Sequence, residues 1–446
     1  MQSLPSLGTT DAALLQLLDH AVGLHSSGQV EQAAQIYRDV LAQDPQQATA
    51  LHYQGIVLYQ QGQSQEGLAQ IQLSCTLQPE NAGWFNDLGN VLFALQQYES
   101  AAQAYVDALQ INPNDHEVWN NLGAAQLQSN ERDSAIEAFE QALFLAPDFA
   151  PALTHLGNIY EAAGDKLTST AYQCRAFVLP PLEGKSKEML GISFYFLGRL
   201  QEAAAVYHLW MAEEPDNPIA AHMYAACSQA EVPGRASNSY IEKYFDRYAE
   251  TFNTNLTDSL GYRGPELMRQ ALVQFASADG QYDILDLGCG TGLCAPVLKP
   301  YARSLIGVDL SAKMLEQAHA YDAYDELIKQ EICAYMATRR AAFDIVLAAD
   351  TVIYFGDLYE VLHASFETVR PGGHVLFTIE TIAPDVPLPA AGFYLHASGR
   401  YRHSAAYLTE VLARVGLQLQ SITDVVLREE IRQPVAGMVV LAQRPN

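Results

Sequence analysis

The feature that most constrains this chain is a spacing of 34 residues that recurs throughout its first half. Three columns of small residues and prolines keep this period, and a fourth, aromatic column follows it in part. The columns are Ala21, Gly55, Gly89, Gly123, Gly157, Gly191 and Ala225; Pro45, Pro79, Pro113, Pro147, Pro181 and Pro215; Ala33, Gly67, Ala101, Ala135, Ser169 and Ala203; and Tyr37, Tyr105, Phe139 and Tyr207. A 34-residue period is typical of stacked helical hairpins.

The chemistry of these columns fits such hairpins, because a small residue lets two helix backbones approach and a proline ends the second helix. Residues 14–217 resemble the tetratricopeptide repeat (TPR) family in about six repeats, and a degenerate last helix follows near 218–228. The resemblance implies an all-α TPR solenoid over residues 1–230 whose concave face binds a protein or peptide. It places four amides at inward-facing positions of first helices: Asn86, Asn90, Asn120 and Asn158.

Charge narrows the class of partner. The chain has a formal net charge of -26; residues 1–235 hold 26 acidic and 8 basic residues, and the remainder hold 25 and 17. An acidic surface repels phosphate backbones, so we expect no nucleic-acid partner and a neutral or basic peptide for the repeats. The alternative is that the acidic surface of the repeats only aids solubility.

Other features of the composition point to a cytoplasmic protein without a membrane segment. No run of about 18 apolar residues occurs, since the most apolar stretch, 341–355, contains Asp344 and Asp350. The N-terminus has no basic residue before its first apolar run, which disfavours a secretory signal. The six cysteines form no C-x-x-C pair, so we expect neither a disulfide framework nor a metal site.

The second half has a different pattern. A segment rich in Pro, Gly and Ser, 231–239, reads as a linker to a domain over 240–446 that opens with an aromatic helical segment, 240–252. Apolar runs then alternate with helical stretches, which predicts a mostly parallel sheet with helices on both faces. The runs are 283–287, 304–309, 327–332, 343–349 and 374–379, and a late pair, 417–427 and 435–443, predicts an antiparallel hairpin at one edge.

A glycine loop follows the first of these runs. The segment Asp286-Leu-Gly-Cys-Gly-Thr-Gly292 lets the backbone approach a ligand closely, and Asp309 ends the next run, where it can accept both hydroxyls of an adenosine ribose. A nicotinamide dinucleotide site has its third glycine one residue later. Asp286 would repel a pyrophosphate but attract an ammonium group. The pattern therefore favours S-adenosylmethionine (SAM).

Residues 240–446 resemble the class I SAM-dependent methyltransferases, which implies a Rossmann-like fold with a mostly parallel seven-stranded sheet. The order of repeats and then methyltransferase resembles a bacterial group of predicted TPR-containing methyltransferases. By this resemblance Leu310 and Met314 pack against adenine, Glu331 and Ile332 lie near its amino group, and Asp350 lies beside the methyl group. The expected cofactor contacts are Asp286, Gly288, Cys289, Gly290, Gly292, Asp309, Leu310, Met314, Glu331, Ile332 and Asp350, joined by Tyr248 and Arg263 from the segment that folds over the cofactor in related enzymes.

Methyl transfer to an oxygen or a protonated amine needs a nearby base. The candidates near strand ends are Asp350, Tyr354 and His403; Glu380 is a fourth, although it is equally compatible with a position facing solvent. Three functions remain open. The favoured one is methylation of a protein or peptide recruited by the repeats. The others are small-molecule O- or N-methylation with repeats used for oligomerisation or docking, and a scaffold without turnover.

Overall fold

The computed structural model describes residues 11–254, 260–430 and 433–446, and the chain divides into two compact units at Leu179/Pro180. This division differs from the sequence prediction, which placed the boundary at 231–239. The last helices with the repeat pattern, 187–228, belong to the second unit together with the sheet. The reason is packing, because segment 231–239 is not a free linker: Ala236 is buried and its backbone N–H donates to the carbonyl of Tyr354 at 2.8 Å.

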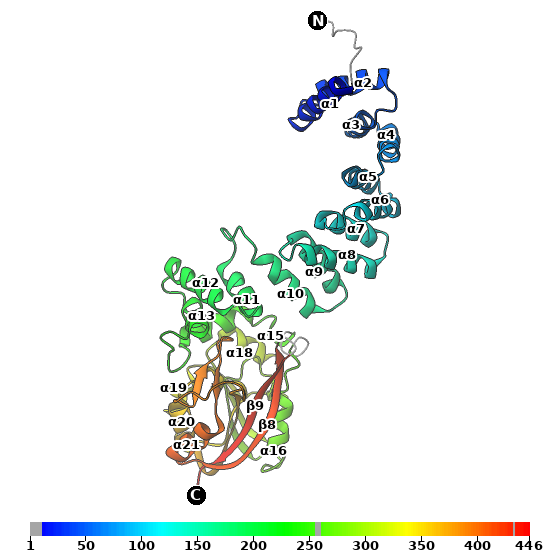
Figure 1. Ribbon diagram of the computed structural model, residues 1–446. Coiled ribbons are helices and arrows are strands. Elements are labelled where there is room, and N and C mark those ends of the chain that lie inside the picture. Colours follow the sequence, from blue (N-terminus) through cyan, green and yellow to red (C-terminus); the bar gives the residue numbers. More distant parts are fainter. Residues whose placement is uncertain (1–10, 255–259, 431–432) are drawn as a thin grey trace. The chain divides into compact units, whose positions relative to one another are not determined.

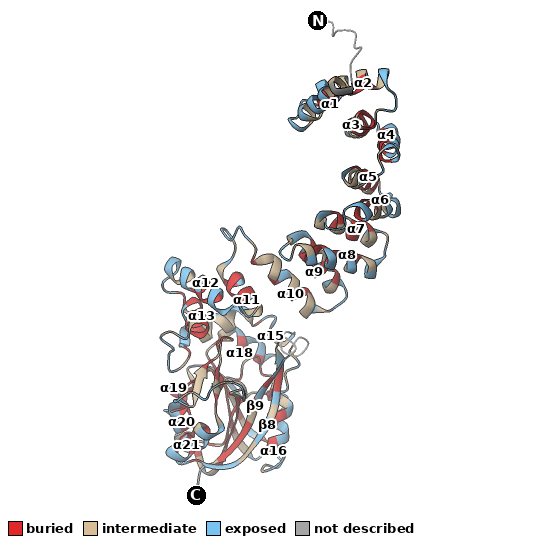
Figure 2. Ribbon diagram, viewed as in Figure 1, coloured by how far each residue is buried: buried red, intermediate tan, exposed pale blue. Residues whose placement is uncertain are grey.

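The first unit consists of successive helical hairpins (Figure 1). Its helices are α1 Asp11–Ser26, α2 Val30–Gln43, α3 Ala48–Gln60, α4 Ser64–Leu77, α5 Ala82–Ala94, α6 Tyr98–Ile111, α7 His116–Gln128, α8 Arg132–Leu145, α9 Ala150–Ala162 and α10 Lys166–Phe177. The small-residue column packs on the aromatic column: a Cβ added at Gly123 would lie 2.8 Å from the ring of Phe139. Buried residues therefore recur on the inner faces of each hairpin (Figure 2).

The second unit contains the remaining helices. They are α11 Lys187–Phe196, α12 Leu200–Glu213, α13 Pro218–Ser228, α14 Asn238–Tyr248, α15 Phe252–Thr254, α16 Gly264–Leu272, α17 Ala295–Leu298, α18 Ala312–His319, α19 Ile332–Met336, the 3-10 helix η2 Val352–Tyr354, α20 Tyr359–Thr368 and α21 Ala405–Val415. Caps mark many of their starts; for example, Ser311 Oγ accepts from the backbone N–H of Met314 at 3.1 Å.

The sheet has nine strands within the described residues. They are β1 Tyr282–Leu287, β2 Ala302–Asp309, β3 Glu326–Lys329, β4 Phe343–Ala348, β5 Val369–Thr381, β6 Phe393–Leu395, β7 Tyr401–His403, β8 Gln418–Glu430 and β9 Gln433–Gln443. The order β3-β2-β1-β4-β5 is parallel, and β9 pairs antiparallel with β5 and with β8. The parallel sheet and edge hairpin were predicted. The short hairpin of β6 and β7, which joins the end of β5, was not.

Alternate residues of the central strands face opposite layers of helices, as expected for a parallel sheet covered on both sides. Leu285 packs with the cluster that includes α19, α20 and α21, whereas its neighbour Ile284 packs with α16 and α17. The core thus holds the carboxyl ends of β1, β2 and β4 at one edge, where the predicted site residues lie.

Within the described ranges, no helix is long and apolar enough to cross a bilayer, and no three His, Cys, Asp or Glu side chains are grouped to hold a metal ion. All six cysteines are buried free thiols.

Candidate active site

A cavity of about 430 Å³ lies at the carboxyl ends of the parallel strands. This is the place where open α/β sheets bind ligands. Of the residues expected to contact the cofactor, the cavity is lined by Asp286, Gly288, Cys289, Gly290, Asp309, Leu310, Met314, Glu331, Ile332, Asp350 and Tyr248. The fold therefore brings together eleven of the thirteen. Gly292 and Arg263 are the exceptions.

The glycine loop has a separate role for each glycine. All three have positive φ, of 62° at Gly288, 54° at Gly290 and 83° at Gly292. A Cβ at Gly290 would meet no atom within 4 Å, so the loop is open to the cavity there. At Gly292 a Cβ would lie 3.2 Å from Cα of Ala318 on α18. Gly292 therefore permits helix packing and does not line the cavity, which corrects its prediction as a cofactor contact.

Asp309 holds the loop and also lines the cavity. Its Oδ2 accepts from the backbone N–H of Gly290 at 3.0 Å, and its Oδ1 accepts from that of Ser311 at 2.8 Å. Burial raises the pKa of Asp309, and these backbone donors oppose the rise. Each carboxylate oxygen has a second lone pair, so Asp309 can still accept from a ligand hydroxyl.

Asp286 lies deeper, with 2% of its surface exposed. The hydroxyl of Tyr324, a residue the sequence did not single out, donates to Asp286 Oδ2 at 2.7 Å. Burial raises the pKa of Asp286 to about 7, with the Tyr324 bond opposing and the charge of Asp309 adding to the rise. A nearby cationic ligand group would stabilise the ionised form of this buried carboxyl group.

Glu331 and Ile332 begin α19 and do not end the third strand, because β3 stops at Lys329. Glu331 caps the helix by accepting from the N–H of Ala334 at 2.7 Å, and it also accepts from Arg235 at 2.9 Å. Its predicted contact with a cofactor stays a prediction, although both residues line the cavity.

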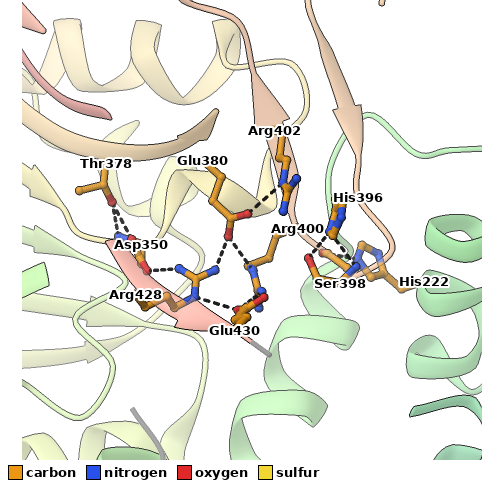
Figure 3. Close-up of polar contacts among 11 residues, drawn as sticks. His222, Asp350, Thr378, Glu380, His396, Ser398, Arg400, Arg402, Arg428 and Glu430 are labelled. Carbon is orange, nitrogen blue, oxygen red and sulfur yellow. Dashed lines mark hydrogen bonds and ion pairs between the residues drawn. The ribbon is translucent and has the colours of Figure 1, made fainter. Parts of the chain in front are cut away.

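The cavity lining also includes aromatic side chains and members of a network of ion pairs. Tyr244, Tyr248 and Phe252 come from 238–254, and Tyr262 and Tyr354 come from other segments of the second unit. Figure 3 shows the ion pairs, which join Asp350, Glu380 and Glu430 to Arg400, Arg402 and Arg428. Three acidic and three basic groups balance, so the network has no net formal charge.

Arg428 is the hub of this network and is 3% exposed. It donates to Asp350 Oδ2 at 2.8 Å, to Glu430 Oε1 at 2.9 Å, and to Glu380. Glu380 is fully buried and does not face solvent, the alternative considered from sequence. Burial by itself raises the pKa of Glu380, but Arg400 and Arg428 outweigh it and lower the pKa to about 2. Arg400, Arg428 and Glu430 line the cavity but were not identified from sequence.

Two of the three candidate bases, Asp350 and Tyr354, line the cavity. Asp350 has a φ of 51°, and its Oδ1 accepts from the hydroxyl of Thr378 at 2.8 Å. Burial raises the pKa of Asp350, and Arg428 opposes the rise. Burial also raises the pKa of Tyr354, so its phenol is neutral near pH 7. Of the two, Asp350 is the candidate base.

The structure contradicts the other candidate, His403. It lies in β7, fully buried and outside the cavity lining, and its Nε2 donates to the carbonyl of Gly356 at 3.0 Å. Burial lowers the pKa of His403 to about 4, so the ring is neutral and structural. Arg263 is likewise outside the cavity lining. Its guanidinium pairs with Glu266 at 3.3 Å, because Arg263 is the N-cap residue of α16 and Glu266 lies in the first turn of that helix.

In the repeats, three amides gather on α5 and α7. Asn121 Nδ2 donates to Asn86 Oδ1 at 3.2 Å and to Asn90 Oδ1 at 3.5 Å. Asn120, which was predicted to bind a partner, is only 9% exposed and packs inside the hairpins. Asn158, on α9, is exposed. Asn86, Asn90 and Asn158 thus remain candidates for partner binding, and Asn120 does not.

The cavity has the features that SAM requires. The backbone is open at Gly290, Asp309 offers lone pairs to a ribose, and Asp286 offers a buried carboxyl to an ammonium group. These three residues line the same cavity, so the residues present fit this cofactor.

Comparisons with known proteins agree with this geometry. Residues 285–377 match the methyltransferase domain family, and residues 18–82, 89–130 and 116–149 match TPR families. The ubiquinone biosynthesis O-methyltransferase of Cronobacter sakazakii is 30% identical over 99 residues, which cover 21% of this chain and 41% of that protein. The malonyl-[acyl-carrier protein] O-methyltransferase of Yersinia pestis is 28% identical over 148 residues, covering 33% and 52%.

Two solved structures are similar to parts of this chain. MamA is 24% identical, with a TM-score of 0.33, covering 35% of this chain and 91% of that one. A SAM-dependent methyltransferase from Mesorhizobium loti is 22% identical, with a TM-score of 0.32, covering 39% and 96%. The chain spans about half or less of the length of the two curated relatives above. The chain therefore combines segments that are similar to TPR families with a segment that is similar to the methyltransferase domain family.

Proposed function

We propose that the second unit transfers the methyl group of SAM to an acceptor at the end of the cavity lined by Asp350, Tyr354 and Arg400. The observation that carries this proposal is the continuity of one cavity from the glycine loop to the network of ion pairs. A cofactor end and an acceptor end in one enclosure provide the alignment that a displacement reaction needs.

Different residues of the chain would bind the cofactor and accept the proton. When bound, SAM supplies a methyl group activated for displacement by the acceptor lone pair. Asp309 and the loop at Gly290 would hold the adenosine, and Asp286 the amino group. For a hydroxyl or ammonium acceptor, Asp350 would receive the proton, because each of its oxygens keeps a lone pair beyond its bonds to Thr378 and Arg428.

We further propose that the repeats recruit a protein or peptide for methylation. The amides of Asn86 and Asn90 can bond a peptide backbone, and the acidic first half of the chain favours a neutral or basic partner. Small-molecule O-methylation is a second candidate, favoured by the names of the curated relatives.

Two experiments on the full chain test these proposals. Calorimetry should detect SAM binding to the wild type. Asp309→Ala should weaken it about 10- to 100-fold, since a hydrogen bond to a charged group is worth about 1.5–3 kcal/mol. Unchanged binding in this variant would remove the cofactor assignment.

Labelled SAM incubated with cell extract then shows whether label enters protein or small molecules. Asn86→Ala with Asn90→Ala should reduce labelling of protein and leave SAM binding intact. Asn114→Ala, an exposed change between α6 and α7, is the control. Label confined to small molecules would reject recruitment and support the second candidate.

A further inference from the structure

We infer that α13, the last helix with the repeat pattern, is part of the acceptor end of the cavity, where His222 positions the turn that carries Arg400. The turn comprises residues 396–400. This inference rests on the proposed function, because it assigns a role in acceptor binding. His222 is a positioning residue, since it does not line the cavity itself.

Helix α13 packs on the hairpin of β6 and β7. Ala225 and Ala226 form one buried cluster with Leu395 and Tyr401. Just beyond the helix, Gln229 Nε2 donates to the carbonyl of Leu395 at 2.8 Å. The hairpin that frames the turn is therefore built against a helix that the sequence assigns to the repeats.

His222 makes the most direct link. It is 5% exposed, and its Nε2 lies 2.8 Å from the carbonyl oxygen of Gly399. A carbonyl only accepts, so Nε2 carries the hydrogen and donates it. The ring also stacks on Tyr240 of α14, with centroids 3.9 Å apart. The imidazole thus contacts Tyr240 of α14 and also donates to the turn. Figure 3 shows His222 beside Ser398 of this turn.

The turn itself is fitted closely to these helices. Gly399 has a φ of 82°, and its N–H donates to the carbonyl of His396 at 2.9 Å. A Cβ at Gly399 would lie 3.0 Å from the hydroxyl of Tyr240 and 3.1 Å from Sδ of Met223. The backbone can approach α13 this closely only because residue 399 is glycine.

Arg400 connects the position of the turn to the lining of the cavity. It follows Gly399, lines the cavity, and has only 17% of its side chain exposed. Its Nε donates to Glu380 at 2.7 Å and its Nη2 donates to Glu430. Release of the turn would therefore move a cation at the acceptor end. The cofactor end would stay in place, because Asp309 and Gly290 are held by bonds within the loop and β2.

The test uses full-length variants. His222→Phe keeps a ring against Tyr240 but removes the donor, His222→Gln keeps a donor, and Gly399→Ala disturbs the turn from its other side. His208→Phe, on the exposed face of α12, is the matched control. Hydrogen exchange by mass spectrometry follows residues 393–403 and 284–292. Calorimetry measures SAM affinity, and labelled SAM with a dilution series of cell extract measures transfer.

We expect His222→Phe and Gly399→Ala to speed exchange of 393–403 roughly tenfold, the effect of one lost buried hydrogen bond. Residues 284–292 and the affinity for SAM should not change. Methyl transfer by His222→Phe and Gly399→Ala should fall in dilute extract and recover in concentrated extract, as expected when the KM for the acceptor is raised. His222→Gln should transfer methyl groups as the wild type does. Unchanged exchange of 393–403, or an equal rise in both segments, would overturn the inference. Failure of the wild type to bind SAM would instead overturn the proposed function.

Discussion

Replacement of Arg428 by methionine should destabilise the second unit strongly. Methionine has similar length but no charge, so Arg428→Met leaves Asp350, Glu380 and Glu430 without their shared partner. Breaking a buried ion pair costs about 3–5 kcal/mol, because the remaining charge stays desolvated. Glu380 retains Arg400 and Arg402, which places the expected loss near the lower end, at about 3 kcal/mol.

The stability that Arg428→Met loses should be largest at neutral pH and smaller at acidic pH. The pKa of Glu380 is lowered from 4.5 to about 2, since Arg400 and Arg428 outweigh its burial. In the wild type its ionised form therefore contributes stability above pH 4.5 that is lost as pH falls toward 2. Without Arg428 the pKa of Glu380 rises. The deficit of the variant should then be full at neutral pH, begin to shrink once pH falls below the raised pKa of Glu380 in the variant, and vanish only toward pH 2, the pKa of Glu380 in the wild type.

Urea unfolding can follow the second unit alone. Trp84 and Trp119 lie in the first unit and Trp210 in the second, so phenylalanine at the first two positions leaves one reporter. The control is Arg414→Met. Arg414 is 53% exposed and 3.9 Å from Glu410, and its loss should cost less than about 1 kcal/mol. A loss below about 1 kcal/mol for Arg428→Met, or one that grows as pH falls, would refute the reasoning.

Two further predictions concern the cofactor end and the repeats. Burial raises the pKa of Asp286 to about 7, and its ionised form attracts the ammonium group of SAM. The Kd measured by calorimetry should therefore rise up to about tenfold per unit as pH falls below 7, and Asp286→Asn should abolish this dependence; a pH-independent Kd in the wild type would contradict the assignment. Gly123→Ala should cost the first unit about 1–3 kcal/mol in urea unfolding by overpacking against Phe139. Gly83→Ala is its control, because a Cβ at this exposed position meets only Asn81 Oδ1 at 3.5 Å, and a stability equal for both variants would count against the packing argument.

The repeats and the main strands could be predicted because their signals are local and periodic. Gly123 and Phe139 lie 16 residues apart, and the same pair of positions recurs in other hairpins, so their contact is visible as a column. The glycine loop and Asp309 could be found for a related reason. A sharp turn after a buried strand needs glycine, and the end of the next parallel strand must lie beside it.

The remaining site residues depend on packing between segments that are far apart in the sequence. Arg428 and Glu380 are 48 residues apart and meet only because β9 joins their strands. His403 has the residue type of a base, but its place in β7 buries it against Gly356. Arg263 and Asn120 have the expected chemistry, but Arg263 pairs with Glu266 and Asn120 is buried.

The glycine loop and the 34-residue period therefore determined by themselves the two folds, their order and the cofactor class. Only the tertiary structure decided that α13 belongs with the sheet, that Asp350, Glu380 and Glu430 join three arginines in an ion-pair network, and which charged groups line the cavity. The physical reason is that a periodic pattern records which face of an element is buried. Which distant element covers that face depends on packing among all of them.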